Sequence, residues 1–280
     1  MSLSVTIITK NEETNIRDCL ESVRFANEIV VLDSSSTDRT RSIAAEYGAK
    51  VIVSTTWAGF GVEKNKSIDA STCSWILALD ADERVSPKLA QEIKEIVGNI
   101  PSAGYDAYEI PRLSWFCGKF IFHSGWRPDY VTRLFRRGSS RFSEELVHER
   151  LITKGGVGRL KHDLIHISFR DLETVLKKIN LYSSASATQM LKAGKSCSPI
   201  SAVLHGLWAF IRTYILRLGF LDGWHGFILA VSNAEGTYYR YLKLWQLSSK
   251  DKTKFTSDSV KSAGVSQAST SQMKKSDDVD

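Results

Sequence analysis

Short apolar runs alternate with amphipathic segments along the first 100 residues of the chain. Four runs are rich in aliphatic and β-branched side chains, which is typical of buried strands: residues 3–10, 28–33, 49–55 and 74–82. Each run is followed by a segment that we predict to be helical: residues 11–26, 36–47, 63–72 and 86–99. The pattern therefore predicts alternating strands and helices.

Capping and breaking residues mark the expected helix ends. Asn11 is expected to open the first helix, because acidic residues follow it in the first turn. Ser36 or Thr37 is expected to cap the second helix, and Gly48 to end it. Pro87 suits the first turn of the fourth helix. A polar turn thus separates each strand from the helix after it.

The four runs are continuous rather than alternating, which indicates strands buried on both faces. Together with the helices between them, they predict an α/β, doubly wound, Rossmann-like and mostly parallel sheet. Ligands of such sheets bind beyond the carboxyl ends of the strands. Functional side chains are therefore expected there.

Composition and charge narrow the class of protein. The chain has 280 residues, 42% hydrophobic and 24% charged, which fits a large globular domain with or without an appendage and excludes a disordered or fibrous protein. Its four cysteines show no C-x-x-C spacing, and Met1 leads directly into a strand pattern, so we expect a cytoplasmic protein without structural zinc. The net charge of +6 suggests an anionic partner: nucleic acid, a phosphate-bearing small molecule or an acidic membrane.

Acidic residues close two of the predicted strands. Asp33 ends one run, and Asp80 and Asp82 end another as Asp-Ala-Asp. A single acid there could simply cap a helix or lie in a solvated turn. No G-x-G-x-x-G or P-loop motif is present, so phosphates must be held in another way. Two carboxylates two residues apart can bind Mg²⁺ or Mn²⁺, and such an ion can bridge a diphosphate.

Four motifs carry a resemblance to a known family. They are "VTIITKNEE", "VVLDSSSTDRT", "EKN" and "ILALDADE". In this order they resemble family 2 glycosyltransferases of the GT-A fold, which take sugars from nucleotide diphosphates, over about residues 3–170. The later "RLFRRGSSRFSEELVHERL" and "GFLDG" resemble more narrowly the lipopolysaccharide-core β-1,4-glucosyltransferase subgroup.

The resemblance implies a donor site and a metal site. It assigns nucleotide or donor-sugar contacts to Thr9, Glu12, Asp33, Lys64, Asn65 and Asp80. It assigns a divalent metal, Mg²⁺ or Mn²⁺, to Asp82, with His166 completing the metal or pyrophosphate shell. Lys64 could instead belong to a solvated helix face, and His166 could be an ordinary core histidine.

The densest basic stretch follows the donor motifs. Residues 112–162 contain eleven Lys and Arg against four Asp and Glu, with six Trp, Phe and Tyr residues interleaved between positions 115 and 130. This mixture suits single-stranded nucleic acid or a phosphorylated sugar acceptor, and we favour the acceptor because a nucleotide-sugar site precedes it. Candidate acceptor or phosphate contacts are Trp126, Arg127, Arg133 and His148. Part of the set must also be core aromatics and solvated arginines.

"SEELVHERL" supplies the candidate base. Inverting sugar transfer needs a group that accepts the proton of the attacking hydroxyl. The family usually ends this segment in an acid pair, often Glu-Asp, whereas this chain has His148-Glu149. We expect Glu149 to be the base, with Glu145 as the alternative, although either could pair with Arg141 or Arg150.

The region 203–245 is rich in apolar and aromatic residues but is interrupted by Arg212, Arg217 and Asp222. Eighteen uninterrupted apolar residues are not present, so we expect helices lying in the headgroup plane of an anionic membrane rather than a bilayer span. Packing on the domain or on a second subunit is the alternative. The polar segment 248–280 is expected to be a disordered tail.

These observations predict three parts: a transferase domain, residues 1–170, with a donor half, 1–100, and an acceptor half, 101–170; a helical extension, 171–247; and the tail. The expected activity is inverting, metal-dependent transfer of a hexose, glucose by resemblance, from a UDP-sugar to a membrane glycolipid such as the lipopolysaccharide inner core. The expected location is the inner face of the cytoplasmic membrane, with no nucleic-acid partner and the oligomeric state open. Alternatives are a glycoside hydrolase, a non-catalytic binding module, or transfer to another envelope or protein acceptor.

Overall fold

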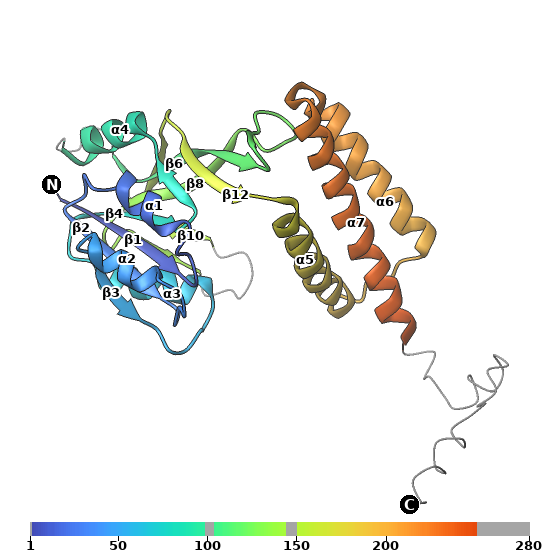
Figure 1. The fold of residues 1–280 in the computed structure, drawn as a ribbon, viewed down its shortest axis with the longest axis horizontal. Coiled ribbons are helices and arrows are strands. Elements are labelled where there is room, and N and C mark those ends of the chain that lie inside the picture. Colours follow the sequence, from blue (N-terminus) through green and yellow to red (C-terminus); the bar gives the residue numbers. More distant parts are fainter. Residues whose placement is uncertain (1, 99–103, 144–149, 251–280) are drawn as a thin grey trace, which may run out of the picture.

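A computed structural model describes residues 2–98, 104–143 and 150–250 (Figure 1). The first half contains β1 (Leu3–Thr9), α1 (Ile16–Ser22), β2 (Glu28–Asp33), α2 (Thr40–Glu46), β3 (Lys50–Val53), α3 (Phe60–Asp69), β4 (Trp75–Asp80), β5 (Glu83–Val85) and α4 (Pro87–Gly98). The second half contains β6 (Tyr105–Phe116), β7 (Lys119–Phe120), β8 (Asp129–Arg136), β9 (Ser140–Phe142), β10 (Leu151–Thr153), β11 (Gly156–Arg159), β12 (Leu164–Phe169), α5 (Leu172–Lys192), α6 (Pro199–Ile211), η1 (Arg212–Leu216), η2 (Gly219–Asp222) and α7 (Trp224–Lys250). The predicted alternation of strand and helix up to α4 is confirmed.

Most strands form one sheet in the order β3-β2-β1-β4-β8-β6-β12-β5, with β7 and β11 paired to β6. β3, β2, β1 and β4 are parallel, as predicted for a doubly wound sheet. Beyond β4 the sheet becomes mixed, because β8 runs antiparallel to both of its neighbours and β5 runs antiparallel to β12. The parallel half therefore carries the donor motifs, and the mixed half follows it in sequence.

β4 shows why the strands read as continuous apolar runs. Trp75, Leu77 and Leu79 belong to the core cluster under α1, α2 and α4. Ile76 and Ala78, between them, face the other side and belong to the cluster that includes Ile68 of α3 and Phe142. Both faces of the strand are buried, and each fully buried aliphatic side chain contributes about 1.5–3 kcal/mol.

Two helix starts differ from the prediction. α1 begins at Ile16 rather than near Asn11, which has φ of 55° and lies in the loop after β1. α2 begins at Thr40, after Ser36 and Thr37. The reason is that these side chains connect loops instead of capping helices: Asn11 Oδ1 accepts Thr37 N at 2.8 Å, and Ser36 Oγ accepts Asn11 N at 2.8 Å. The predicted end of α2 at Gly48, which has φ of 72°, is confirmed, as is the predicted start of α4 at Pro87.

The last three helices form a unit beside the sheet domain, with α7 lying between α5 and α6 (Figure 1). Asp171 caps α5, accepting Thr174 N at 2.7 Å. α6 and η1 together form an 18-residue helix, Pro199–Leu216, that is long and apolar enough to cross a membrane by length and composition alone. Arg212 is the only charged residue in this helix, and the expectation of helices lying in the headgroup plane stays a prediction.

Candidate functional site

Polar side chains meet where β1, β2 and β4 end. Thr9 pairs in register with Asp33, and Ile8 pairs with Asp80. Because these strands are parallel, their carboxyl ends lie at one edge of the sheet, where doubly wound proteins bind ligands. Thr9, Asp33 and Asp80 are therefore brought together at this edge.

Asp33 lies below the surface of the edge and is fully buried. Its Oδ2 accepts hydrogen bonds from Thr9 Oγ1, at 3.1 Å, and from Ser36 Oγ, while its Oδ1 accepts Ser36 N at 2.9 Å. Arg41 Nε lies 3.8 Å from Oδ1. The carboxylate thus holds the loop after β2, and a nucleotide would reach it only if Ser36 moved.

Asp80 is held between two cations. Its Oδ1 lies 3.0 Å from Lys64 Nζ, and its Oδ2 accepts a charge-assisted hydrogen bond from Arg133 Nη2. Burial alone would raise the pKa of Asp80, but the positive charges of Arg133 and Lys64 outweigh it and hold the pKa well below its usual range. Asp80 is therefore ionised at neutral pH, with about a third of its side chain exposed at the edge of the sheet (32%).

Glu83 explains how the chain tolerates three carboxylates within four residues. Its side chain is fully buried, and its Oε1 accepts Arg133 Nη2 at 2.8 Å. Its Oε2 accepts the backbone N–H of Asp80 at 3.0 Å. Burial acts to lower the pKa of Arg133, yet the charges of Asp80 and Glu83 raise it above its ordinary value. Arg133 therefore bridges two of the three acids, and Lys64 at Asp80 and Arg112 at Glu83, 3.7 Å away, supply further positive charge.

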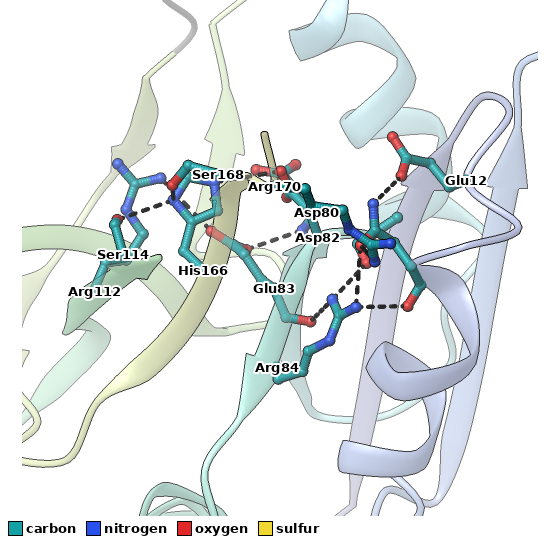
Figure 2. Close-up of polar contacts among 12 residues, drawn as sticks. Glu12, Asp80, Asp82, Glu83, Arg84, Arg112, Ser114, His166, Ser168 and Arg170 are labelled. Atoms are coloured by element: carbon teal, nitrogen blue, oxygen red, sulfur yellow. Dashed lines mark hydrogen bonds and ion pairs between the residues drawn. The ribbon is translucent and has the colours of Figure 1, made fainter. Parts of the chain in front are cut away.

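Asp82, the third acid, turns toward His166. The Asp82 Oδ2 and His166 Nε2 atoms are 3.4 Å apart. The other ring nitrogen, Nδ1, lies 3.2 Å from Ser114 Oγ and 3.0 Å from Ser168 Oγ (Figure 2). If Nδ1–H donates to a serine, the lone pair of Nε2 points to the side of Asp82 and can bind a metal. The backbone supports this pairing, since Ile167 N donates to Asp82 O at 2.9 Å.

Glu12 lies in the loop after β1, within the electrostatic field of Asp82. Burial raises its pKa, a hydrogen bond from Asn15 Nδ2 at 2.7 Å lowers it, and the negative charge of Asp82 raises it again. The positive charges of Lys178 and Arg170 lower it. The expected nucleotide residue Glu12 and the expected metal residue Asp82 are therefore part of one charged region.

A cavity of about 420 Å³ opens beside His166. Trp126 forms one wall, and Lys178 and Tyr182 reach it from α5. Arg112 also lines it, paired to Asp129 with an N–O distance of 2.6 Å. The cavity offers ring faces and cationic groups next to the Asp82–His166 pair, which suits a sugar that carries anionic groups.

Asn65 does not face the edge of the sheet. Its Nδ2 donates to Phe142 O and its Oδ1 accepts Phe142 N, each at 2.9 Å. Both ends of its amide are thus used to hold β9 against α3, and a nucleotide contact by Asn65 does not fit. Of the "EKN" motif, Lys64 is the residue that reaches the site.

Most of the basic stretch is neutralised inside the domain. The pairs are Arg112–Asp129, Arg127–Asp163, Arg136–Asp106, Arg141–Asp69 and Arg159–Glu109. Arg127 binds Asp163 through both of its terminal nitrogens, at 2.8 and 3.2 Å, and Arg133 is buried beneath Asp80. The expectation that Arg133 faces an acceptor is therefore wrong, because its side chain is buried between two carboxylates. The role of Arg127, whose side chain is 30% exposed, stays a prediction. Trp126 lines the cavity, and its contact with an acceptor stays a prediction.

Three expected residues lie outside the described residues: His148, Glu149 and the alternative base Glu145. Their assignments stay predictions. The residues that sequence reasoning missed are Glu83, Ser114 and Ser168. Glu83 stood within the quoted acidic motif, and Ser168 follows His166 by two positions, so the period of a strand could have placed both side chains on one face.

Comparisons with known proteins agree on one family. The family described as "Glycosyl transferase family 2" matches residues 4–150. A protein of Rickettsia typhi named "Uncharacterized glycosyltransferase RT0209" is 30% identical over 91% of this chain and 91% of its own length. A protein of Rhizobium meliloti named "Lipopolysaccharide core biosynthesis glycosyltransferase LpsC" is 28% identical over 88% of this chain and 93% of its own.

Among solved structures, glucosyl-3-phosphoglycerate synthase from Mycobacterium tuberculosis, in complex with Mn²⁺, UDP and glucosyl-3-phosphoglycerate, is 23% identical. The match covers 41% of this chain and 44% of the synthase, with a TM-score of 0.33. At that score, the ligands of the synthase say nothing about this chain.

Proposed function

Since the chain belongs to glycosyl transferase family 2 and is a glycosyltransferase with the GT-A fold, we propose that it transfers a hexose, with inversion, from a UDP-sugar to a membrane glycolipid. The observation that carries the proposal is the pairing of Asp82 with His166 beside the cavity. An oxygen and a nitrogen donor face each other there, next to an ionised Asp80 and two cations that hold it. A hydrolase would need no such nucleotide edge.

The donor half of the proposal rests on the strand ends. Asp80, about a third exposed, can accept hydrogen bonds from hydroxyl groups of the ribose or the donor sugar. Thr9 and Asp33 hold the loop against which a base would lie. Lys64 Nζ, 3.0 Å from Asp80, adds a positive charge close to the position proposed for the diphosphate.

The residues present fit a divalent cation. Among the described residues no group of three or more His, Cys, Asp and Glu side chains gathers, so the protein would supply Asp82 and His166 and the diphosphate would supply further oxygens. Mg²⁺ and Mn²⁺ are commonly held this way, by one or two protein ligands and substrate phosphates. When bound, such an ion would stabilise the negative charge of the departing diphosphate. Ser114 and Ser168 orient the imidazole for this role.

The acceptor half of the proposal rests on the cavity and on the segment after β9. Trp126 and Tyr182 offer ring faces to a sugar, and Lys178 offers a cation to an anionic substituent. We propose Glu149 as the base that accepts the proton of the attacking hydroxyl, with Glu145 as the alternative. The name of the Rhizobium relative, a lipopolysaccharide core biosynthesis glycosyltransferase, supports a lipopolysaccharide-core acceptor for this chain. The choice of glucose and of the inner core rests on the motif resemblance alone.

We further propose that the helical unit lies on the inner face of the cytoplasmic membrane. Large apolar side chains are widely exposed on α6, η1, η2 and the start of α7: Ile200, Val203, Leu204, Leu207, Trp208, Ile215, Leu216, Leu218, Phe220, Leu221 and Trp224. Ile200 and Trp224 are 75% and 78% exposed. Large contiguous apolar surfaces on a protein typically mark a membrane or protein interaction site. Arg212 lies exposed within the same surface and favours anionic lipid.

Replacing Asp82 with Ala should weaken metal-dependent UDP binding about 10- to 100-fold, as expected for loss of one ligand of a site. Calorimetry with UDP, in Mn²⁺ and in EDTA, measures the effect. The matched control is Asp18→Ala, whose carboxylate is 71% exposed. UDP affinity that still rises with Mn²⁺ in Asp82→Ala, to the extent seen in the unmodified protein, would refute the metal site.

Replacing Glu149 with Gln should preserve UDP binding but lower the turnover of UDP-glucose onto inner-core lipopolysaccharide by about two orders of magnitude or more, the usual contribution of a positioned base. Glu145→Gln is the comparison. If Glu145→Gln loses turnover and Glu149→Gln does not, the base is Glu145. If neither variant loses turnover, the base lies elsewhere.

The protein should float with vesicles containing anionic lipid at low salt, and high salt should weaken the binding because it screens the charge of Arg212. Trp224→Glu should reduce flotation, since it places a charge at the most exposed apolar position described. Trp57→Glu is the control, because Trp57 is also exposed, at 49%, but lies in the sheet domain. Protein that stays with the soluble fraction at both salt concentrations would rule out membrane docking.

A further inference from the structure

The motif "GFLDG", residues 219–223, has no role in the reaction described so far, yet it places a buried carboxylate beside the acceptor cavity. Asp222 is only 2% exposed. Its Oδ1 accepts Phe122 N at 3.0 Å and lies 3.2 Å from His123 Nδ1. Its Oδ2 accepts His123 N at 3.0 Å and Ser124 Oγ at 3.2 Å. Every contact of this carboxylate goes to one short loop of the sheet domain.

Backbone carbonyl groups in the motif and just before it also bind β7 and the loop that follows β7. The carbonyl oxygen of Asp222 accepts Lys119 Nζ at 3.0 Å. A short distance upstream, Arg217 O accepts Ser124 N at 2.8 Å. Gly125 has φ of 77°, a conformation that favours glycine, and its Cα lies against the Arg217 side chain, from which a Cβ atom would be 2.3 Å away. The loop between β7 and β8 is therefore bound to η2 and to the residues before it.

This loop leads directly into the wall of the acceptor cavity. Trp126 N donates to His123 O at 3.0 Å, which links the tryptophan to the part of the loop that Asp222 binds. The Trp126 ring packs against Phe116 and Phe169, with centroids 5.7 and 5.9 Å away. Gly125 and Trp126 both line the cavity, together with His166.

The loop would not keep this shape by itself. Ser124 has φ of 61°, a left-handed conformation that costs a residue with a side chain roughly 1–2 kcal/mol. Such conformations persist only when their surroundings hold them in place. Here, hydrogen bonds to Asp222 hold Phe122, His123 and Ser124 in place.

η2 itself is fixed by close contacts at two glycines, Gly219 at its start and Gly226 in the first turn of α7. A Cβ atom at Gly219 would lie 2.7 Å from Thr213 O and 2.9 Å from Ser124 Oγ, and one at Gly226 would lie 1.9 Å from Gly219 O. Between these glycines, Phe220 and Leu221 point outward and are 47% and 54% exposed. The motif thus has one side on the loop and the other on the apolar surface of the helical unit.

We propose that Asp222 is a positioning residue for the acceptor: by holding residues 122–124, it sets Trp126 as the wall of the cavity and fixes that cavity relative to the apolar surface of the helical unit. The inference rests on the proposed function, because it assigns the cavity to the acceptor. It predicts that Asp222 acts on acceptor binding and leaves donor binding unchanged.

The test is steady-state kinetics of full-length Asp222→Asn with UDP-glucose and inner-core lipopolysaccharide in mixed micelles. The asparagine has the same shape but has one oxygen fewer to accept the N–H groups of Phe122 and His123. We expect KM for the lipopolysaccharide to rise roughly tenfold or more, with kcat at saturation within about threefold and the affinity for UDP unchanged. The control is Glu173→Gln, a 71% exposed carboxylate on α5 that should change neither constant.

Ser124→Ala tests the same contact without removing the buried charge. It should raise KM for the lipopolysaccharide by a smaller factor, and this effect should vanish in the Asp222→Asn background because both changes break one contact. Hydrogen exchange of the amides of residues 122–126 should become faster in Asp222→Asn. Unchanged exchange, or an unchanged KM in both variants, would overturn the inference.

The proposed function and the positioning role of Asp222 can be tested separately. If the unmodified protein fails to transfer glucose to the lipopolysaccharide, the proposed function is wrong, and the exchange experiment still decides whether Asp222 holds the loop. If the unmodified protein transfers glucose and Asp222→Asn lowers kcat and UDP affinity instead of raising KM, the proposed function stands and the positioning role is wrong.

Discussion

The donor site depends on a buried arginine between two carboxylates. Arg133 is 6% exposed and binds both Asp80 and Glu83, so neither acid is left buried without a partner. An uncompensated buried charge costs several kcal/mol. At Asp80, burial alone would raise the pKa, and the positive charges of Arg133 and Lys64 outweigh it. Lys64 adds a second cation at Asp80. Asp82, the acid of the motif that Arg133 does not bind, faces His166 instead.

Much of the fold and part of the site could be predicted from local sequence. Continuous apolar runs such as residues 75–79 predicted strands buried on both faces, because burial on both sides removes the polar alternation. Asp80 and Asp82 could be placed at a ligand edge because the ends of parallel strands coincide. His166 could be paired with Asp82 only through the family resemblance, since 84 positions separate them and no local pattern records a contact between distant strands.

The wrong predictions share a physical cause. Asn11, Asn65 and Arg133 have side chains whose usual roles are capping, ligand binding and anion binding, and the sequence could not show that each had a distant partner inside the fold. Asn65 binds the backbone of Phe142, 77 positions away, and Arg133 binds Asp80 and Glu83. The basic stretch failed as an indicator of a surface for the same reason: its charges are opposed by acids on neighbouring strands and loops. Long-range polar pairing decides these cases, whereas hydrophobic periodicity decides the strands and helices.

We propose that Asp82 and His166 together hold a divalent cation against the diphosphate of the donor. Electron spin-echo spectroscopy of the protein with Mn²⁺ and UDP, labelled with ¹⁵N-histidine, tests it directly. If His166 binds the ion, a nitrogen coupling to manganese should appear only with UDP present. It should be lost in His166→Gln, while Mn²⁺ still couples to the phosphorus of the nucleotide. A Mn²⁺–UDP complex on the protein without any histidine coupling would contradict it.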